Sequence, residues 1–224
     1  MKYNAVVFDL FETLVTEWGH PKYTKSEMCA DLGIERPVFS KFWGEKSDDR
    51  NLGYTTFEES LYYVFEQCGK HPDPQTAAKV IDKRTRTKAA CFDYVLPEVY
   101  GLLDSIRGMG LKTAIVSNCS PEEVTALKES KIYPYFDTVL LSCEVHMKKP
   151  DPRIYAEAAK ILKSSPEECL FVGDGGSREL EGAANAGMKP VQAKWYTNRF
   201  PEKRETIAGF EAAEEPPEIL RYLK

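Results

Sequence analysis

The chain has 224 residues, with 30 basic and 35 acidic side chains and a formal net charge of −5. Because this acidic balance contains no basic run, the composition argues against nucleic acid or an anionic membrane as the main partner. No apolar segment approaches the roughly 20 residues that span a bilayer, and the first residues lead into a predicted strand without the features of a signal peptide. We therefore expect a cytoplasmic protein.

The cysteine pattern points in the same direction. The six cysteines form no CxxC pair and no regular framework, so we expect reduced thiols packed as small apolar side chains. The three histidines are too scattered to indicate a metal cluster or a catalytic triad.

A short apolar run opens the chain and ends on a carboxylate. Val6-Val7-Phe8 is typical of a buried strand, and Asp9 follows it directly. Open α/β sheets place reactive groups at the carboxyl ends of such strands. An aspartate that only caps the next turn is the competing interpretation.

Between residues 17 and 92 the pattern is helical, with no buried strand. Four amphipathic helices are indicated by their starts, which are Thr24, Arg36-Pro37, Thr56 and Asp73-Pro74. The connector 46–54 between the second and third helices is our candidate substrate loop, through Arg50 or Tyr54. We predict an all-helical cap domain over 17–92, inserted into a core made of 1–16 and 93–224.

Strands and helices alternate over the rest of the chain. Apolar strands are predicted at 112–116, 139–141, 170–172 and 190–193, with helices between them and a closing helix near 217–223. This alternation indicates right-handed βαβ units. The predicted fold class is therefore α/β, a Rossmann-like doubly wound parallel sheet with the helical cap inserted.

Polar residues follow several of these strands. Ser117-Asn118, Lys149-Pro150 and Asp174 each stand at or just beyond a strand end, as Asp9 does. Carboxyl ends of parallel strands meet at one edge of the sheet, so these side chains should converge. Asp9 and Asp174 would then form an oxygen-rich site suited to Mg²⁺.

The sequence resembles the haloacid dehalogenase-like superfamily, in the group with a helical cap after the first strand. The resemblance covers nearly the whole chain. It is carried by the residues 8–14 (Phe-Asp-Leu-Phe-Glu-Thr-Leu), 116–118 (Val-Ser-Asn), 149–155 (Lys-Pro-Asp-Pro-Arg-Ile-Tyr), 172–174 (Val-Gly-Asp) and 182–188 (Gly-Ala-Ala-Asn-Ala-Gly-Met).

This resemblance implies a Mg²⁺-dependent phosphohydrolase acting on a small phosphorylated metabolite. Asp9 would be the nucleophile that forms an aspartyl-phosphate, Ser117 would bind phosphoryl oxygens, and Lys149 would offset the carboxylates. We expect the substrate to contact Thr13, Asn118 and Arg50. The expected metal site comprises Asp9, the Phe11 backbone carbonyl, Asp174 and Glu179.

Two positions depart from the family's phosphatases. These usually carry a second aspartate two positions after the nucleophile, and here that residue is Phe11, which cannot transfer a proton. Such general acid–base help is typically worth about 10²- to 10⁴-fold in rate. Glu12 points the other way in an extended backbone, so we expect it at the surface or at the cap hinge. Glu179 stands where the family more often has aspartate.

Two alternatives remain open on the sequence. Phe11 and Tyr155 resemble the family's metal-independent 2-haloacid dehalogenases, in which Arg36 or Arg50 would cradle the halide. We expect both arginines to be exposed. Asp174 argues against this reading, because those enzymes resemble one another in having serine there. A catalytically weak phosphate-binding protein is the third hypothesis.

The expected partner is a small phosphate ester or a haloacid, and the protein is expected to be a monomer or a weak homodimer.

Overall fold

A computed structural model describes residues 2–71, 73–202 and 207–224. Across these residues, six strands form one sheet in the order β3-β2-β1-β4-β5-β6, and every pairing is parallel. The strands are β1 (Ala5–Phe8), β2 (Lys112–Ser117), β3 (Thr138–Leu141), β4 (Cys169–Gly173), β5 (Lys189–Ala193) and β6 (Glu211–Ala213). The predicted doubly wound α/β fold is confirmed, and the strand order reverses beside β1, where such folds place their ligands.

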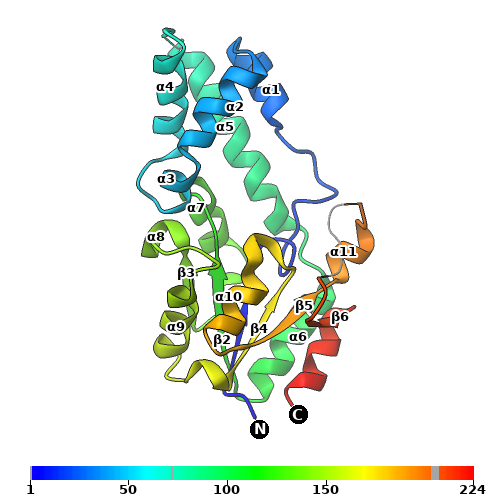
Figure 1. The fold of residues 1–224 in the computed structure, drawn as a ribbon. Coiled ribbons are helices and arrows are strands. Elements are labelled where there is room, and N and C mark those ends of the chain that lie inside the picture. The colour runs from blue at the N-terminus through cyan, green and yellow to red at the C-terminus, as the bar shows by residue number, and fades with distance from the viewer. Residues whose placement is uncertain (1, 72, 203–206) are drawn as a thin grey trace.

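Helices cover both faces of the sheet (Figure 1). Alternate residues of β1 point to opposite faces, so Val6 and Phe8 pack with α6 (Pro97–Gly108), whereas Val7 packs with α9 (Pro152–Ile161) and α10 (Glu179–Asn185). Both faces of the central strands are therefore buried, as the apolar runs in the sequence require. The remaining helices of this part are α7 (Pro121–Glu129), α8 (Ser142–Val145) and α11 (Trp195–Arg199), with short 3₁₀ helices η1 (Ala90–Asp93), η2 (Tyr133–Tyr135), η3 (Pro166–Glu168), η4 (Gly176–Arg178) and η5 (Pro216–Tyr222).

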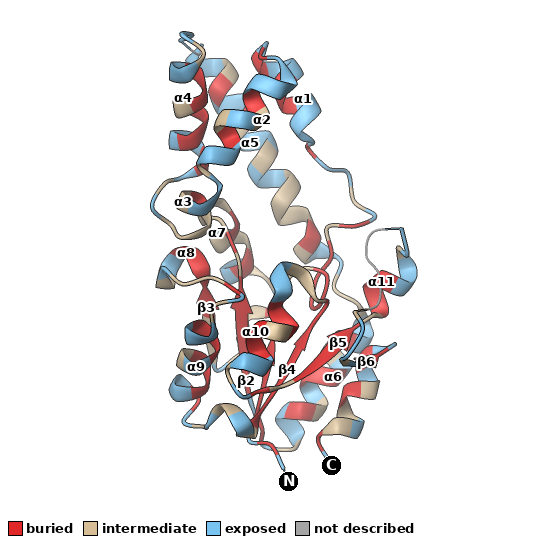
Figure 2. Cartoon of the chain, viewed as in Figure 1, coloured by how far each residue is buried: buried red, intermediate tan, exposed pale blue. Residues whose placement is uncertain are grey.

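A separate group of helices, which we call the helical lobe, stands over the carboxyl ends of the strands (Figure 1). Within the described part of residues 17–92 it comprises α1 (Lys25–Leu32), α2 (Arg36–Glu45), α3 (Ser47–Asn51), α4 (Phe57–Gln67) and α5 (Pro74–Ala89). Thr24 and Thr56 form capping boxes, and Asp73 caps α5. The lobe has its own hydrophobic cluster, built around Phe39, Leu61 and Val64, and Figure 2 shows these inner faces buried.

The structure differs from the sequence prediction in its short elements. Residues 47–51 form α3 where we expected a connector, and β6 and α11 have no predicted counterpart. The closing helix is a 3₁₀ helix. Each of these elements is seven residues or shorter, too short for hydrophobic periodicity to reveal. All six cysteines are free thiols, as expected. Among the described helices, none has the length and apolar character to cross a membrane.

The segment after α3 joins the lobe to the sheet. The Leu52 carbonyl accepts a hydrogen bond from His146 Nδ1 at 2.6 Å, and Tyr54 stacks on the His146 ring with centroids 5.2 Å apart. Gly53 has φ +72°, and a Cβ at this position would lie 1.9 Å from the Cys143 carbonyl oxygen. The lobe therefore rests on the segment after β3 through backbone that only glycine accommodates.

We predict that Gly53→Ala destabilises the protein more than Gly69→Ala does. Gly69 also has a positive φ, +62°, but nothing lies within 4 Å of a Cβ there. Gly69→Ala should therefore cost only the backbone strain, about 1 kcal/mol, whereas Gly53→Ala adds a collision with fixed backbone. Denaturant unfolding of the two variants measures the difference. Equal losses would show that the 52–54 segment moves freely from the sheet.

Candidate active site

Asp9 is the first residue after β1 and is only 5% exposed. Its backbone N–H donates to the Val172 carbonyl at 2.9 Å, which fixes it against the neighbouring strand β4. One carboxylate oxygen, Oδ2, accepts a hydrogen bond from Thr13 Oγ1 at 2.9 Å. The other, Oδ1, is paired with Lys149 Nζ. Both oxygens are thus oriented by neighbouring groups.

Lys149 is buried between two carboxylates. Its ammonium bonds both Asp9 and Glu179. Burial acts to lower the pKa of Lys149, but the two carboxylates outweigh it and the pKa is raised, so the side chain remains charged. The backbone is held equally firmly, because Lys149 N donates to Asn118 Oδ1 at 2.8 Å and Asn118 Nδ2 donates to the Lys149 carbonyl at 3.0 Å.

Thr13 connects the ends of β1 and β4. Its hydroxyl donates to Asp9 and accepts a hydrogen bond from the Asp174 backbone N–H at 3.0 Å. Thr13 is fully buried and does not line the cavity at the strand ends. The expected contact between Thr13 and a substrate therefore has no support in the geometry, and the residue instead positions the two aspartates. The sequence signal for this positioning role was the short separation of four residues between Asp9 and Thr13.

Glu179 enters the same cluster from the start of α10. Its Oε1 accepts the Gly175 N–H at 2.9 Å while Oε2 bonds Lys149. A Cβ on Gly173 would lie 2.3 Å from Oε1, so glycine at the end of β4 is what admits this carboxylate. Burial, followed by the charge of Asp9, raises the pKa of Glu179 well above its ordinary value.

The three carboxylates fit a divalent cation. Asp9, Asp174 and Glu179 each offer an oxygen, and these oxygens lie within 4.8 Å of one another. One lysine against three buried carboxylates leaves a formal charge of −2 when all are ionised. An all-oxygen donor set of this kind suits Mg²⁺ rather than a softer metal. Phe11, whose carbonyl was the fourth expected ligand, lines the same cavity.

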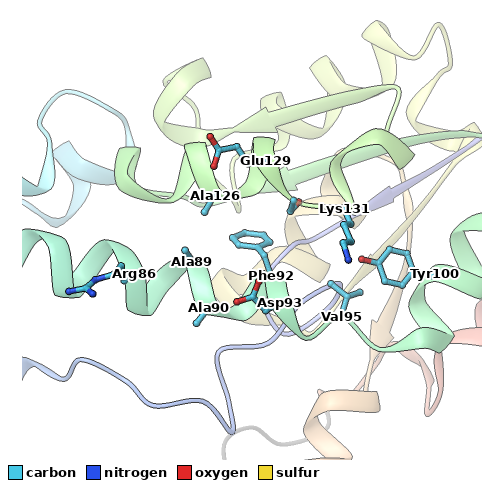
Figure 3. Close-up of a pocket in the computed structure, with 11 residues that line it drawn as sticks. Arg86, Ala89, Ala90, Phe92, Asp93, Val95, Tyr100, Ala126, Glu129 and Lys131 are labelled. Atoms are coloured by element: carbon cyan, nitrogen blue, oxygen red, sulfur yellow. The ribbon is translucent and has the colours of Figure 1, made fainter.

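A cavity of about 150 Å³ lies over these groups. Seven of the predicted site residues line it: Asp9, Phe11, Ser117, Asn118, Lys149, Asp174 and Glu179. The sequence motifs are therefore brought together at one edge of the sheet. A larger cavity, of about 560 Å³, lies elsewhere, between the end of α5 and α7. Figure 3 shows Phe92 directed between these two segments. Asp9, Asp174 and Glu179 are not among the residues that line this cavity.

Arg50 and Arg36 have opposite surroundings. Arg36 is exposed, as expected, but Arg50 is only 6% exposed, so the expectation that it lies in solvent is wrong. Its guanidinium lies 3.7 Å from the centroid of the Trp43 ring, and Nη2 donates to the Trp43 carbonyl at 3.0 Å. Arg50 lines a second cavity of about 310 Å³ that adjoins the first and shares Phe11 and Asn118 with it.

Glu12 is buried rather than at the surface. It has a positive φ of 65°, its Oε2 accepts a hydrogen bond from the Thr16 hydroxyl, and Oε1 accepts the Glu17 N–H at 3.1 Å. Burial raises the pKa of Glu12 to about 7, although these hydrogen bonds oppose the shift. The sequence prediction assumed an extended backbone at Glu12. Because the backbone turns here, the alternation of side-chain directions along a strand does not apply to this residue.

The comparisons with known proteins define the class. The family model "haloacid dehalogenase-like hydrolase" matches residues 3–187. The chain belongs to this family and is a hydrolase.

One curated relative is a glyceraldehyde 3-phosphate phosphatase of Methanopyrus kandleri, 31% identical over 72% of this chain and 70% of that protein. Two solved structures share the fold. One is a 2-haloacid dehalogenase from Pseudomonas syringae pv. Tomato, with 20% identity, coverage of 99% of this chain and 100% of that one, and a TM-score of 0.70. The other is a HAD phosphatase from Thermococcus onnurineus, with 20% identity, coverage of 98% and 97%, and a TM-score of 0.67. The fold alone therefore does not separate phosphatase from dehalogenase.

We predict that Glu12→Gln removes a pH dependence of stability. Because the folded protein holds the Glu12 proton up to about pH 7 and the unfolded chain releases it near pH 4.5, the free energy of unfolding should fall as pH rises through this window. The loss is at most about 3 kcal/mol. Denaturant unfolding in EDTA from pH 5 to pH 8 measures it. In Glu12→Gln the slope should be shallower, and in the exposed control Glu58→Gln it should match the wild type.

Proposed function

We propose that this protein is a magnesium-dependent phosphohydrolase in which Asp9 accepts the phosphoryl group of a small phosphate ester. The observation that supports the proposal is the cluster of three buried carboxylates around one lysine. With all three carboxylates ionised, the formal charge of −2 in a buried site is costly unless a cation neutralises it. The phosphatase relative is consistent with this chemistry.

In the proposed reaction, an oxygen of Asp9 attacks phosphorus and the bond to the leaving oxygen breaks. The aspartyl-phosphate is then hydrolysed, which restores Asp9 and releases phosphate. Mg²⁺, held by Asp9, the Phe11 carbonyl, Asp174 and Glu179, would supply the positive charge that lets two anions meet. Lys149 adds a fixed charge beside Asp9, and Ser117, at the end of β2, offers its hydroxyl to the transferring oxygens.

Phe11 determines which leaving groups the site handles well. Its ring is half-buried, with Phe92 at a centroid distance of 6.3 Å and Lys88 Nζ at 5.4 Å. It therefore places a hydrocarbon surface where a proton donor would stand. We infer that the enzyme favours leaving groups that need little protonation, such as phenolates.

The helical lobe is proposed to act as a cap over this site. It lies over the carboxyl ends of the strands, and the Arg50 cavity lies between it and the sheet. Closure of such a cap would exclude bulk water while the phosphoryl group is transferred to Asp9, and it would select the substrate.

A 2-haloacid dehalogenase is the second candidate, favoured by the aromatic ring at Phe11. Halide departs without a proton, and that reaction needs no metal. Tyr155 does not support the dehalogenase hypothesis. Its side chain is buried behind the site, and its hydroxyl donates to the Glu179 carbonyl at 3.0 Å. Asp174 and Glu179 would leave a metal-free site with excess negative charge beside the nucleophile.

The first test compares an aryl phosphate with 2-chloropropionate, each with magnesium or EDTA. We expect phosphate release that requires magnesium and is lost in Asp9→Asn, with circular dichroism as the control for folding. Chloride release that resists EDTA would reject the phosphohydrolase hypothesis and support the dehalogenase hypothesis. Phosphate or magnesium binding without turnover of either substrate would leave only a binding protein.

The second test introduces the missing acid. Phe11→Asp should raise kcat on an alkyl phosphate by about 10²-fold or more, because general acid–base catalysis is typically worth 10²- to 10⁴-fold. The gain on an aryl phosphate should be much smaller. Phe11→Asn is the matched control, since it has a similar shape and no transferable proton. A wild-type enzyme that already hydrolyses both esters equally fast would show that another residue supplies the proton.

A further inference from the structure

The Arg50 cavity continues from the phosphoryl site toward the helical lobe. The two cavities share Phe11 and Asn118, so a phosphate ester bound at Asp9 would pass its leaving group between these side chains. From the lobe, the cavity is lined by Arg50 and Arg84; from the start of α7, it is lined by Glu122. Its volume of about 310 Å³ is at the lower end of the range for small-molecule sites.

Three residues that line this one cavity each carry a buried polar atom that forms no hydrogen bond within the described residues: Arg50 Nη1, Arg84 Nε and Glu122 Oε2. Arg84 Nε lies 3.8 Å from the other Glu122 oxygen, Oε1, as a loose ion pair. A buried donor or acceptor left without a partner is destabilising, and more so when it is charged. Polar groups of this kind beside a cavity are the ones that a polar ligand would satisfy.

Arg50 is the best placed of the three. The Trp43 ring and carbonyl fix its guanidinium from one side, which leaves Nη1 as the free arm of the fork. Burial lowers the pKa of Arg50 to about 10, so the side chain is still a cation at neutral pH.

The remaining charges of the cavity are already paired. Lys88 bonds Glu17 and also Glu123, the latter at 2.7 Å, so this lysine is not available to a ligand. Glu122 faces the two arginines, and burial raises its pKa. The cavity therefore offers two cationic donors and one acceptor to an incoming group.

We propose that this cavity binds the leaving group of the substrate through a carboxylate at Arg50, and that a hydroxyl or amino group next to that carboxylate donates to Glu122. The substrate class is then a phosphate ester of a small hydroxy acid or hydroxy amino acid. A planar carboxylate matches the geometry of guanidinium donors. A second phosphate is disfavoured, because its higher charge would meet Glu122 in the same small space. This inference rests on the proposed phosphohydrolase function.

The test compares matched phosphate esters with and without the carboxylate. O-phosphoserine is paired with O-phosphoethanolamine, and 3-phosphoglycerate with glycerol 3-phosphate. In the wild type, kcat/KM should be at least about 10-fold higher for the acid in at least one pair, since hydrogen bonds to charged groups contribute about 1.5–3 kcal/mol. The difference should lie mainly in KM, because the contact is remote from the reacting atoms.

Arg50→Gln should reduce the acid-to-neutral ratio of kcat/KM by about 10- to 100-fold. Arg50→Lys keeps a charge but not the fork, so its ratio should fall between those of Arg50→Gln and the wild type. The matched control is Arg86→Gln, an exposed arginine two positions beyond Arg84 on α5 that pairs with Asp82 at the surface, and it should keep the wild-type ratio. Equal rates within both pairs, with a ratio that Arg50→Gln leaves unchanged, would overturn the inference, as would a preference for pyrophosphate over every acid.

A binding measurement separates this inference from the proposed function. Calorimetry with glycerate and with serine, which carry no phosphoryl group, needs no turnover. We expect one of them to bind the wild type and Arg86→Gln at least about 10-fold more tightly than Arg50→Gln. Arg50-dependent binding without phosphatase activity would support the cavity and reject the phosphohydrolase. Phosphatase activity without such binding and without a preference for acids would reject the cavity alone.

Discussion

The ammonium of Lys149, enclosed by Asp9 and Glu179, is the interaction on which the rest of the site depends. Buried carboxylates repel one another and lose hydration, and the cation between two of them offsets part of this unfavourable energy. The reciprocal bonds between Asn118 and the Lys149 backbone hold that cation in place. One lysine does not neutralise three ionised carboxylates, and this imbalance is what the proposed magnesium ion would offset.

Strand topology explains how distant segments reach this point. The register pairs Phe8 with Val172 and with Ile115, so the residues that follow all three strands emerge at the same level. Thr13 then joins two of these ends through one hydroxyl, and glycine at the end of β4 leaves room for Glu179. The chemistry thus follows from where parallel strands stop.

Most of the fold and much of the site were predictable because their signals are local. Buried strands show as apolar runs, and the strand-end residues follow them immediately. The burial of Arg50 was not predictable, because it depends on Trp43 and on α7, which the chain reaches about 70 residues later. The burial of Glu12 was not predicted, because its left-handed backbone breaks the alternation that an extended strand would follow. Very short elements such as β6 depend on pairing with a neighbour, which leaves little trace in sequence.

The segment after β3 contacts two parts of the molecule with adjacent side chains. Lys148 pairs with Asp48 of α3 in the helical lobe, and Lys149, one peptide bond later, turns inward to Asp9. A displacement of the lobe would pull on the same backbone that sets the position of the inner lysine. One dipeptide thus contacts the lobe at the surface through Lys148 and the nucleophile in the interior through Lys149.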